Sequence, residues 1–309
     1  MTNLTDPIFT NEEAARAHFE AIRWPDGRVC PHCGTIGNST LMQGKTTRAG
    51  LYKCKDCRKP FTATMGAVYE RSHIPLHKWL LATHLLVSSK KGMSAHQLFR
   101  MLGLGSYRTA WFMAMRIREA MRPESMDPMG GGGGTVEVDE TFTGRQKGGK
   151  KVARSVHHKM KVLSLLDRTT GRTSSVVIPN MKPENVLPIL RANIAAEARV
   201  MTDDAGQYRF LSRDFAEHHV VRHESGEYAL PGGITANTIE GYFSIFKRGM
   251  RGVYQRCAQH HLHRYLAEFD FRYTNREAVG TNDAMRALKA VRGTVGKRVT
   301  YQQPDQQAA

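Results

Sequence analysis

The sequence predicts an α/β fold in which a mixed sheet flanked by helices follows a small cysteine-rich module and a helical segment. Three observations predict it. Four of the five cysteines form two CxxC pairs near the N-terminus. Residues 75–122 have a helical hydrophobic pattern punctuated by glycine and serine. Beyond Thr135, β-branched runs alternate with helical patterns up to about Asn275.

The composition favours a polyanionic partner. The 309 residues include 45 Lys and Arg against 28 Asp and Glu, a net charge of +17. These bases are spread along the chain, which suits an extended surface for the phosphates of DNA or RNA. A basic protein that is merely soluble is the alternative. The sequence has no apolar run long enough to span a membrane and no secretory signal at its start, so we expect no membrane association.

Residues 1–28 are predicted to contain one short amphipathic helix, over residues 10–24. Thr10 and Glu13 have the spacing of a capping box, in which each end of the pair satisfies a backbone N–H at the start of the helix. The Pro-Asp-Gly sequence that follows Trp24 is expected to end the helix.

Residues 29–65 are predicted to form a zinc ribbon. The two-residue spacing in CPHC and CKDC lets both thiolates of each pair face one tetrahedral centre. Two redox dithiols are the alternative, but neither pair begins a helix after a βαβ pattern. His32 is expected to be exposed, Phe61 to pack in the small core, and Cys257 to be an ordinary thiol. The predicted Zn²⁺ ligands are Cys30, Cys33, Cys54 and Cys57.

Residues 66–128 are predicted to be helical and to end in a helix-turn-helix-like arrangement. Ser94 and Ser106 are the expected N-caps, and a glycine-containing turn joins the two helices. An ordinary three-helix bundle without a ligand is the alternative. If the segment binds DNA, the side chains expected to face it are Tyr107, Arg108, Arg116 and Arg118.

Glycine and polar composition predict two flexible segments. The five consecutive glycines within residues 129–134 predict a linker that leads into an α/β domain over residues 135–277. Residues 278–309 are polar and basic and are predicted to form a flexible tail.

Acidic residues recur on two predicted strands of the α/β domain. In TVEVDETFTG, which begins at Thr135, Glu137 and Asp139 share one face of the strand. A second run ends in Asp203 and Asp204. Acids at the C-terminal end of an apolar strand are well placed for an active site, because open α/β sheets bind ligands there.

The predicted order of elements brings two of these acids together. Three strands are followed by a helix, a strand, a helix, a strand and a final helix, which is the order of the ribonuclease H-like fold. In that fold the first and fourth strands are neighbours, so Asp139 and Asp203 would meet. Two adjacent carboxylates repel unless a cation neutralises them. Mg²⁺, or Mn²⁺ in its place, suits oxygen ligands and a phosphate substrate.

The run from Ile234 to Tyr254 predicts a basic helix with two faces. Asn237 and Glu240 have capping-box spacing, so a purely structural role fits the local sequence at least as well as catalysis. A metal-binding acid flanked by bases is, however, what a phosphodiester substrate requires. The bases predicted to contact DNA on this helix are Lys247, Arg248 and Arg251.

Together these motifs resemble those of bacterial insertion-sequence transposases with a zinc ribbon and a DDE-type, ribonuclease H-like catalytic domain. The resemblance extends in one consistent order from about residue 20 to residue 277. The matching motifs are CPHC and CKDC, FTATMGAVYERSHIPLHKWLLA, VEVDETFTG, VMTDDAGQY, HESGEYA, NTIEGYFSIFKRGMRGVY and HLHRYLAEFDFRYTNR.

The resemblance implies that Asp139, Asp203 and Glu240 are catalytic carboxylates that hold two Mg²⁺ ions, with Asn237 as an accompanying site residue. Asp203 is preferred to Asp204 because it follows Thr202 in the family's Thr-Asp pattern; sequence physics alone does not separate these neighbours. The implied partners are DNA, at the element ends and at the target, and at least one further copy of the chain.

The resemblance also implies a cytoplasmic, nucleoid-associated protein of bacteria. Two other functions remain open at this point: a ribonuclease H-like nuclease that cuts without joining, and a zinc-ribbon regulator that binds nucleic acid without cutting it.

Overall fold

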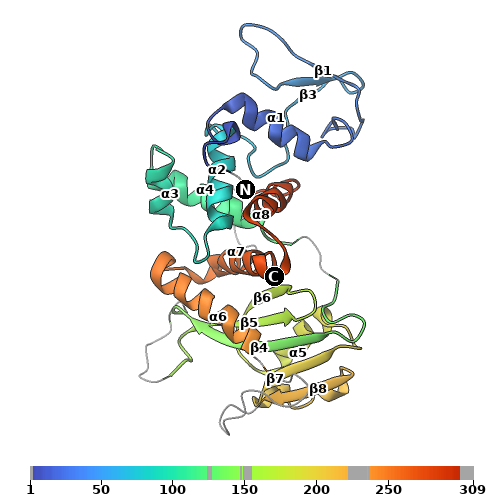
Figure 1. Cartoon of the computed structure of the whole chain (residues 1–309), viewed down its shortest axis with the longest axis vertical. Coiled ribbons are helices and arrows are strands. Elements are labelled where there is room, and N and C mark those ends of the chain that lie inside the picture. The colour runs from blue at the N-terminus through green and yellow to red at the C-terminus, as the bar shows by residue number, and fades with distance from the viewer. Residues whose placement is uncertain are drawn as a thin grey trace. The chain divides into compact units, whose positions relative to one another are not determined.

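The computed structural model divides the chain into two compact units (Figure 1). The structure describes residues 3–123, 127–146, 148, 155–221, 235 and 237–299. The motif HESGEYA and the last ten residues lie outside the described residues. No helix within the described ranges is long and apolar enough to cross a bilayer. The first unit comprises Met1–Ser89, Met93–Arg122 and Asn282–Ala309, and the second comprises Lys90–Gly92 and Pro123–Thr281.

The predicted N-terminal helix is present as α1 (Glu12–Arg23). Its N-cap is Asn11, whose side chain accepts hydrogen bonds from the backbone N–H groups of Glu13 and Ala14, both at 2.9 Å. The prediction of Thr10 as the cap is therefore wrong by one residue. Asn is at least as good a cap as Thr, because its side-chain oxygen reaches the same unpaired N–H groups.

Three short antiparallel strands form the cysteine-rich module. They are β1 (Ser39–Leu41), β2 (Tyr52–Cys54) and β3 (Pro60–Phe61). Phe61 is fully buried and packs on Trp24 and Tyr52, with ring centroids 6.0 and 5.9 Å away. This aromatic cluster is the small core that the sequence predicts around Phe61.

Four further α-helices lie in the part of the first unit that the structure describes. Ser94 and Ser106 cap the second and third of them, as predicted, by accepting hydrogen bonds from Gln97 N and Thr109 N, both at 3.1 Å. The helices are α2 (Leu76–Ser88), α3 (Ala95–Met101), α4 (Tyr107–Ala120) and α8 (Asp283–Arg292).

Helix α8 lies in the stretch predicted to be a flexible tail, so that prediction is wrong for these residues. Asn282 caps the helix through Met285 N at 2.9 Å. Ala290 and Val291 are buried, and α8 packs against α2, α1 and α4. The stretch is polar on average, but its apolar residues lie along one side of the helix. Packing of that side against other helices holds α8 in place.

The second unit is built on a five-stranded mixed sheet in the order β6-β5-β4-β7-β8. Strands β4, β5 and β6 are antiparallel neighbours, while β7 and β8 run parallel to β4. The predicted order of the five strands along the chain and the adjacency of the first and fourth strands are confirmed. The strands are β4 (Thr135–Thr143), β5 (Met160–Asp167), β6 (Thr173–Ile178), β7 (Arg199–Asp203) and β8 (Glu217–Val221).

Helices cover both faces of this sheet. Val186 and Leu190 of α5 (Pro183–Asn193) join the apolar core on the face of Val136 and Val138. Helices α6 (Asn237–Gly249) and α7 (Leu262–Thr274) cover the other face, where α6 packs on β4 and β5 and α7 packs on β6 (Figure 1). The helix predicted between β7 and β8 is instead two short 3₁₀ turns, η2 (Gly206–Tyr208) and η3 (Leu211–Arg213).

The glycine run before β4 forms an ordered turn rather than the predicted flexible linker. Met129 is buried and donates its N–H to Asn193 O at 2.7 Å. Gly130 has φ +76° and donates its N–H to the Asp167 carboxylate at 3.2 Å. A Cβ on Gly130 would lie 2.6 Å from the Cβ of Ala198. Glycine is used here because the backbone must approach its neighbours closely.

Candidate metal centres and nucleic-acid interface

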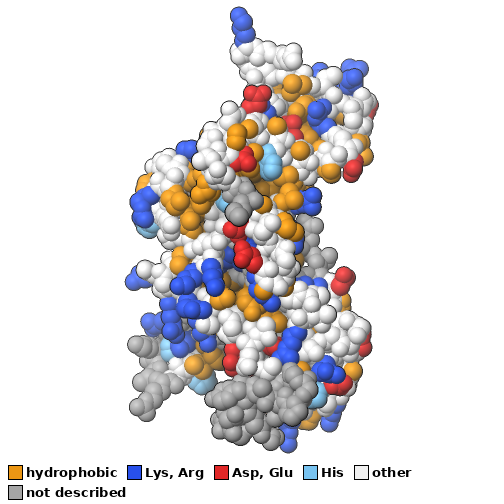
Figure 2. All heavy atoms as spheres, in the orientation of Figure 1, with side chains coloured by type: hydrophobic (Ala, Val, Ile, Leu, Met, Phe, Trp, Pro, Cys, Tyr) orange, Lys and Arg blue, Asp and Glu red, His pale blue; other side chains and the backbone are white. Residues whose placement is uncertain are grey.

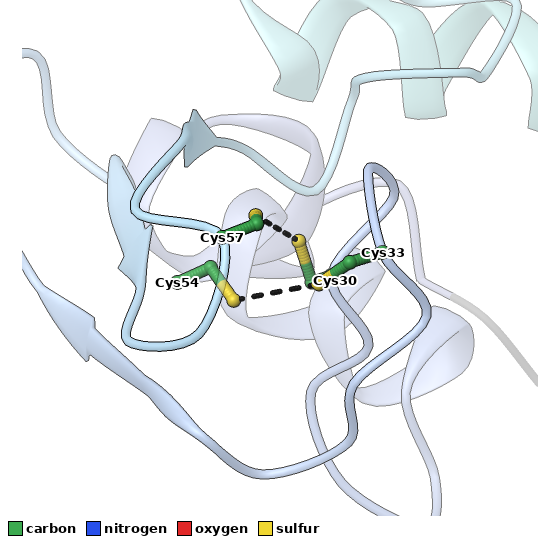
Figure 3. A group of neighbouring side chains, drawn as sticks. All are labelled: Cys30, Cys33, Cys54 and Cys57. Atoms are coloured by element: carbon green, nitrogen blue, oxygen red, sulfur yellow. Dashed lines mark hydrogen bonds between the residues drawn. The ribbon is translucent and has the colours of Figure 1, made fainter.

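The four predicted zinc ligands meet at one point (Figure 3). The Sγ atoms of Cys30 and Cys57 lie 3.7 Å apart, and those of Cys33 and Cys54 lie 3.6 Å apart. Four thiolates bound tetrahedrally at a Zn–S distance of about 2.3 Å would be separated by about 3.8 Å. The donor set and its spacing therefore fit a structural zinc ion.

The two cysteine knuckles have the same backbone geometry. Cys30 N donates to Thr35 O at 2.9 Å, and Cys54 N donates to Lys59 O at 3.1 Å, so each donor and acceptor are five residues apart. The residue after the second cysteine of each pair has a left-handed backbone, with φ +79° at Gly34 and +59° at Arg58. The turn directs both thiolates of a knuckle to the same side.

The acidic site forms where β4 extends past the C-terminal end of β7. Glu137 is paired with Met201 across these parallel strands. Two residues further along each strand, the same register brings Asp139 level with Asp203. Ligand oxygens of Asp139, Glu140 and Asp203 lie within 4.8 Å of one another. Two of the three predicted catalytic acids thus meet, together with an acid that the sequence did not single out.

The electrostatics of Asp139 indicate a cation site. Burial, together with the negative charges of Glu140, Asp203 and Glu240, raises its pKa to about 7. One hydrogen bond opposes this trend, because Glu140 N donates to Asp139 Oδ1 at 2.6 Å. A carboxylate held among other carboxylates in this way is stabilised by a divalent cation. The all-oxygen donor set fits Mg²⁺ or Mn²⁺.

Glu140 links β4 to the turn that follows β7. Its two carboxylate oxygens accept hydrogen bonds from Gln207 Nε2 at 3.0 Å and from the Tyr208 hydroxyl at 2.7 Å. Burial raises the pKa of Glu140, while the bond from Tyr208 opposes that shift. The sequence offered one signal for this residue, its position directly after Asp139, but a neighbour on a strand is expected to face the other way.

Glu137 fixes the start of α6, the helix that contains Glu240. The side chain is fully buried, and its Oε2 accepts a hydrogen bond from Ile239 N at 2.7 Å. Its Oε1 accepts a hydrogen bond from Arg168, which also donates to Thr235 O. Glu137 lies on the same strand face as Asp139, so one strand presents an acid to the site and another acid to the helix beside it.

The remaining predicted site residues lie at the first turn of α6 and after β7. Glu240 is outside the group of three acids but close enough to Asp139 to raise its pKa. Asn237 and Glu240 are both exposed on the first turn of α6. Asp204 is exposed and does not join the group, so the structure favours Asp203 of the two neighbours.

A basic surface follows Glu240 along α6. Lys247 and Arg248 are exposed near the end of this helix, and Arg251 is exposed in the π-helical turn η5 (Met250–Tyr254) that continues it. Figure 2 shows Lys and Arg side chains gathered over α6. The three predicted DNA contacts of this helix are therefore accessible.

The helix-turn-helix-like segment presents a smaller basic surface than predicted. Tyr107 and Arg108 are exposed at the start of α4, and the Tyr107 ring stacks on His96 with centroids 4.3 Å apart. Arg116 is buried, donates to Glu70 O at 2.9 Å and lies over the Trp79 ring. Arg118 is also buried. The prediction that these two arginines face DNA is wrong, because they pack inside the helical unit.

Comparisons with known proteins agree with both centres. Residues 132–274 match the family described as the ISXO2-like transposase domain, and residues 10–60 match the transposase zinc-ribbon domain. The chain belongs to the insertion-sequence transposases. A similar protein from Halobacterium salinarum, described as an uncharacterized protein in transposable element ISH50, is 29% identical over 301 residues. The similarity covers 88% of this chain and 96% of that protein.

The two matched regions of this transposase coincide with its two candidate centres. The zinc-ribbon match includes all four cysteines. The transposase-domain match includes the group formed by Asp139, Glu140 and Asp203, and also Glu240. The acidic group therefore lies in the part of the chain that is similar to transposase domains.

Proposed function

We propose that this transposase cleaves the ends of its insertion sequence and joins them to target DNA in a reaction that depends on divalent metal ions. The observation that carries the proposal is the meeting of Asp139 and Asp203, which come from separate strands, at a point where Glu240 adds further negative charge. Keeping these acids ionised together costs free energy, which a bound divalent cation offsets.

Asp139, Asp203 and Glu240 would hold the ions, and Asn237 would orient a ligand or the scissile phosphate. Two bound Mg²⁺ or Mn²⁺ ions supply an activated water for cleavage and stabilise the attacking and leaving oxygens of an in-line displacement. The cationic side chains of Lys247, Arg248 and Arg251 would bind phosphates of the DNA near the reacting one. No side-chain nucleophile is required, since water or a DNA 3′-hydroxyl attacks.

Recognition of the element ends is assigned to the first unit. The zinc ribbon and α4 would bind the terminal repeats, with Tyr107 and Arg108 nearest to the DNA at the start of α4. Joining two ends to one target requires at least two copies of the chain in the working complex. Because its substrate is the genome, we place the protein in the cytoplasm, associated with the nucleoid.

A cleavage assay on DNA from the ends of the element tests the proposal. Asp139→Asn and Asp203→Asn should each lower Mg²⁺-dependent strand cleavage by at least about 1,000-fold, because each removes a charged ligand of the two metal ions. Asp204→Asn is the matched control and should change cleavage by less than about threefold. Binding of the same DNA, measured by gel shift, should be unchanged in all three variants.

Two results would contradict the proposal. Cleavage at the normal rate by Asp139→Asn would remove that residue from the site. The second result is that the protein cuts intact ends but never joins pre-cleaved ends to a target under the same conditions. The protein would then be a nuclease rather than an enzyme that joins DNA.

A further inference from the structure

A pocket of about 240 Å³ lies beyond the acidic site, where β4 ends and β5 begins. Its wall is formed by the end of β4, the start of β5 and the C-terminal part of α6 with the turn η5. Thr143 of β4 pairs with Met160 of β5 at this end of the sheet. All of the residues that line it belong to the second unit.

The lining combines positive charge with an apolar surface. Lys159, Lys247 and Arg251 contribute three positive charges, and no acid is among the lining residues that the structure describes. Phe142, Met160 and Met250 contribute the apolar part. A phosphate alone would be bound by the cations and would gain nothing from the aromatic ring and the two thioethers. A nucleotide with an unpaired base matches both parts of the lining.

Strand β4 and helix α6 each contribute residues both to the acidic region and to the pocket. Phe142 is three residues beyond Asp139 on β4, which is about 10 Å of extended chain. Lys247 is seven residues beyond Glu240 on α6, which is also about 10 Å along a helix. Strand β4 and helix α6 therefore each extend about 10 Å from the acids to the pocket. This distance equals the rise of about three nucleotides in a DNA duplex.

The backbone around the pocket is held in an unusual conformation. Helix α6 changes to the π-helical turn η5, and Gln255, which also lines the pocket, has φ +55° and ψ −50°. Its N–H donates to Met250 O at 2.9 Å. Non-glycine residues with positive φ and π-helical turns are both enriched at functional sites, where their strain is maintained by the surrounding structure.

Hydrogen bonds also fix the described residues next to Lys159. The buried ammonium group of Lys161 donates hydrogen bonds to His157 O at 3.1 Å and to Lys159 O at 3.2 Å. Gln146 N donates to His158 O at 2.8 Å, which ties the chain after β4 to the chain before β5. These contacts hold Lys159 at the pocket without occupying its own ammonium group.

From this combination we propose that the pocket binds one unpaired nucleotide of the DNA strand, with its phosphate on Lys159, Lys247 and Arg251 and its base on Phe142. This inference rests on the proposed function for the identity of the polymer, and it adds that the DNA near the reacting phosphate is locally unpaired. Single-stranded DNA should therefore reach the pocket, whereas an intact duplex should not.

Cys257 lines the same pocket and is half-buried, so its thiol can report occupancy in the full-length protein. The experiment measures the rate at which N-ethylmaleimide modifies Cys257, by peptide mass spectrometry, with no DNA, with a single-stranded oligonucleotide, with the blunt duplex of the same sequence, and with inorganic phosphate. We expect the single strand to slow the modification at least tenfold, and the duplex and phosphate to slow it less than about twofold.

Lys159→Gln and Lys182→Gln form a matched pair of variants. Both remove one positive charge, but Lys182 precedes α5 and is not part of the pocket lining. Lys159→Gln should abolish the protection by single-stranded DNA, and Lys182→Gln should preserve it. Equal protection by duplex and single strand, or equal behaviour of the two variants, would overturn the proposal.

A second measurement does not depend on thiol reactivity. A single strand that contains 2-aminopurine should lose fluorescence on binding, because its base stacks on Phe142, and Phe142→Leu should restore most of that fluorescence. No difference between Asp203→Asn and the double variant Asp203→Asn, Phe142→Leu would contradict base binding. Both readouts are taken with Asp203→Asn, which is not expected to cleave, so failure of the pocket and failure of the proposed catalysis give different results.

Discussion

The two candidate metal centres of this transposase are assembled in opposite ways. The zinc ribbon takes its ligands from two knuckles of the same backbone geometry within the short segment from Cys30 to Cys57. The acidic site brings together Asp139 and Asp203, which are 64 residues apart in sequence, and Glu240 of a later helix is close enough to raise the pKa of Asp139. One centre is a local motif, and the other exists only after a five-stranded sheet has formed.

This difference predicts opposite roles for the metal in folding. The ribbon has a small aromatic core and short strands, so zinc supplies much of its folding free energy. The acidic site is held by a sheet, by hydrogen bonds and by the core that includes Val136, Leu163 and Val200. Its acids are therefore brought together before any ion binds, and the ion relieves a repulsion rather than creating the fold.

The largest effect is expected from breaking the ribbon. Cys54→Ser removes one thiolate of four, and structural zinc sites bind with an apparent free energy of about 10–16 kcal/mol, so the ribbon should unfold. Limited proteolysis mapped by mass spectrometry should show new cleavage within residues 29–65, and bound zinc should disappear. The matched variant Asp203→Asn should keep the zinc and the protease resistance. A ribbon that stays resistant without zinc would contradict the comparison.

Glu137→Gln should have the next largest effect, because it breaks a buried ion pair. The substitution leaves the charge of Arg168 without its carboxylate partner and weakens the acceptor for Ile239 N. Removing one partner of such a pair costs about 3–5 kcal/mol.

Hydrogen exchange gives a specific readout for Glu137. The amide of Ile239 should exchange faster in Glu137→Gln than in the wild-type protein, and cleavage should fall even at saturating Mg²⁺ because Glu240 is no longer held beside Asp139. Glu184→Gln, at a mostly exposed acid in the first turn of α5, is the control for loss of a negative charge. Unchanged exchange at Ile239 would show that α6 is positioned by other contacts.

Asp139→Asn should stabilise the metal-free protein while it abolishes activity. The folded-state pKa of Asp139, about 7, lies above its usual value of 3.8, so the folded state holds a proton that the unfolded state releases. This proton on Asp139 stabilises the folded state. The stabilisation is fully present below pH 3.8 and is lost as the pH rises through 7. The loss is at most about 4 kcal/mol.

Thermal unfolding of both zinc-loaded proteins between pH 5 and pH 8, first in buffer free of Mg²⁺ and of chelator and then with Mg²⁺, tests this sign. The melting temperature of the wild-type protein should fall relative to that of Asp139→Asn as the pH rises, and Mg²⁺ should close the gap. A gap that is independent of pH and of Mg²⁺ would show that the acids do not repel one another.

Local patterns predicted much of the fold and of the site. The CxxC spacing, the caps at Ser94 and Ser106 and the strand order are each encoded by neighbouring residues or by the sequence of elements, and the structure confirms them. The meeting of Asp139 with Asp203 followed from the strand order alone. These features depend on short-range chemistry or on topology, both of which a single sequence contains.

Tertiary contacts decided the rest. Arginine is a residue type that commonly contacts DNA, but Arg116 packs over the Trp79 ring and donates a hydrogen bond to the Glu70 carbonyl inside the helical unit. The glycine run has the composition of a linker, but close packing of Gly130 on Ala198 makes it a turn. In each case the residue type was compatible with two environments, and only the packing of distant segments selected one.

Glu140 gives the smallest expected effect and the sharpest test of which acids bind metal. Its carboxylate oxygens already accept hydrogen bonds from Gln207 and Tyr208, so it acts as a link between β4 and the turn after Asp203. In Glu140→Gln the amide oxygen still accepts one of these bonds, and a lost neutral hydrogen bond costs about 1 kcal/mol. The same substitution removes one of the charges that repel Asp139, which offsets part of this loss. The melting temperature should therefore change little and cleavage should fall less than about tenfold, far less than in Asp139→Asn.

If cleavage by Glu140→Gln falls as far as it does in Asp139→Asn, Glu140 is a metal ligand, and the acidic site then takes two of its acids from adjacent positions of one strand.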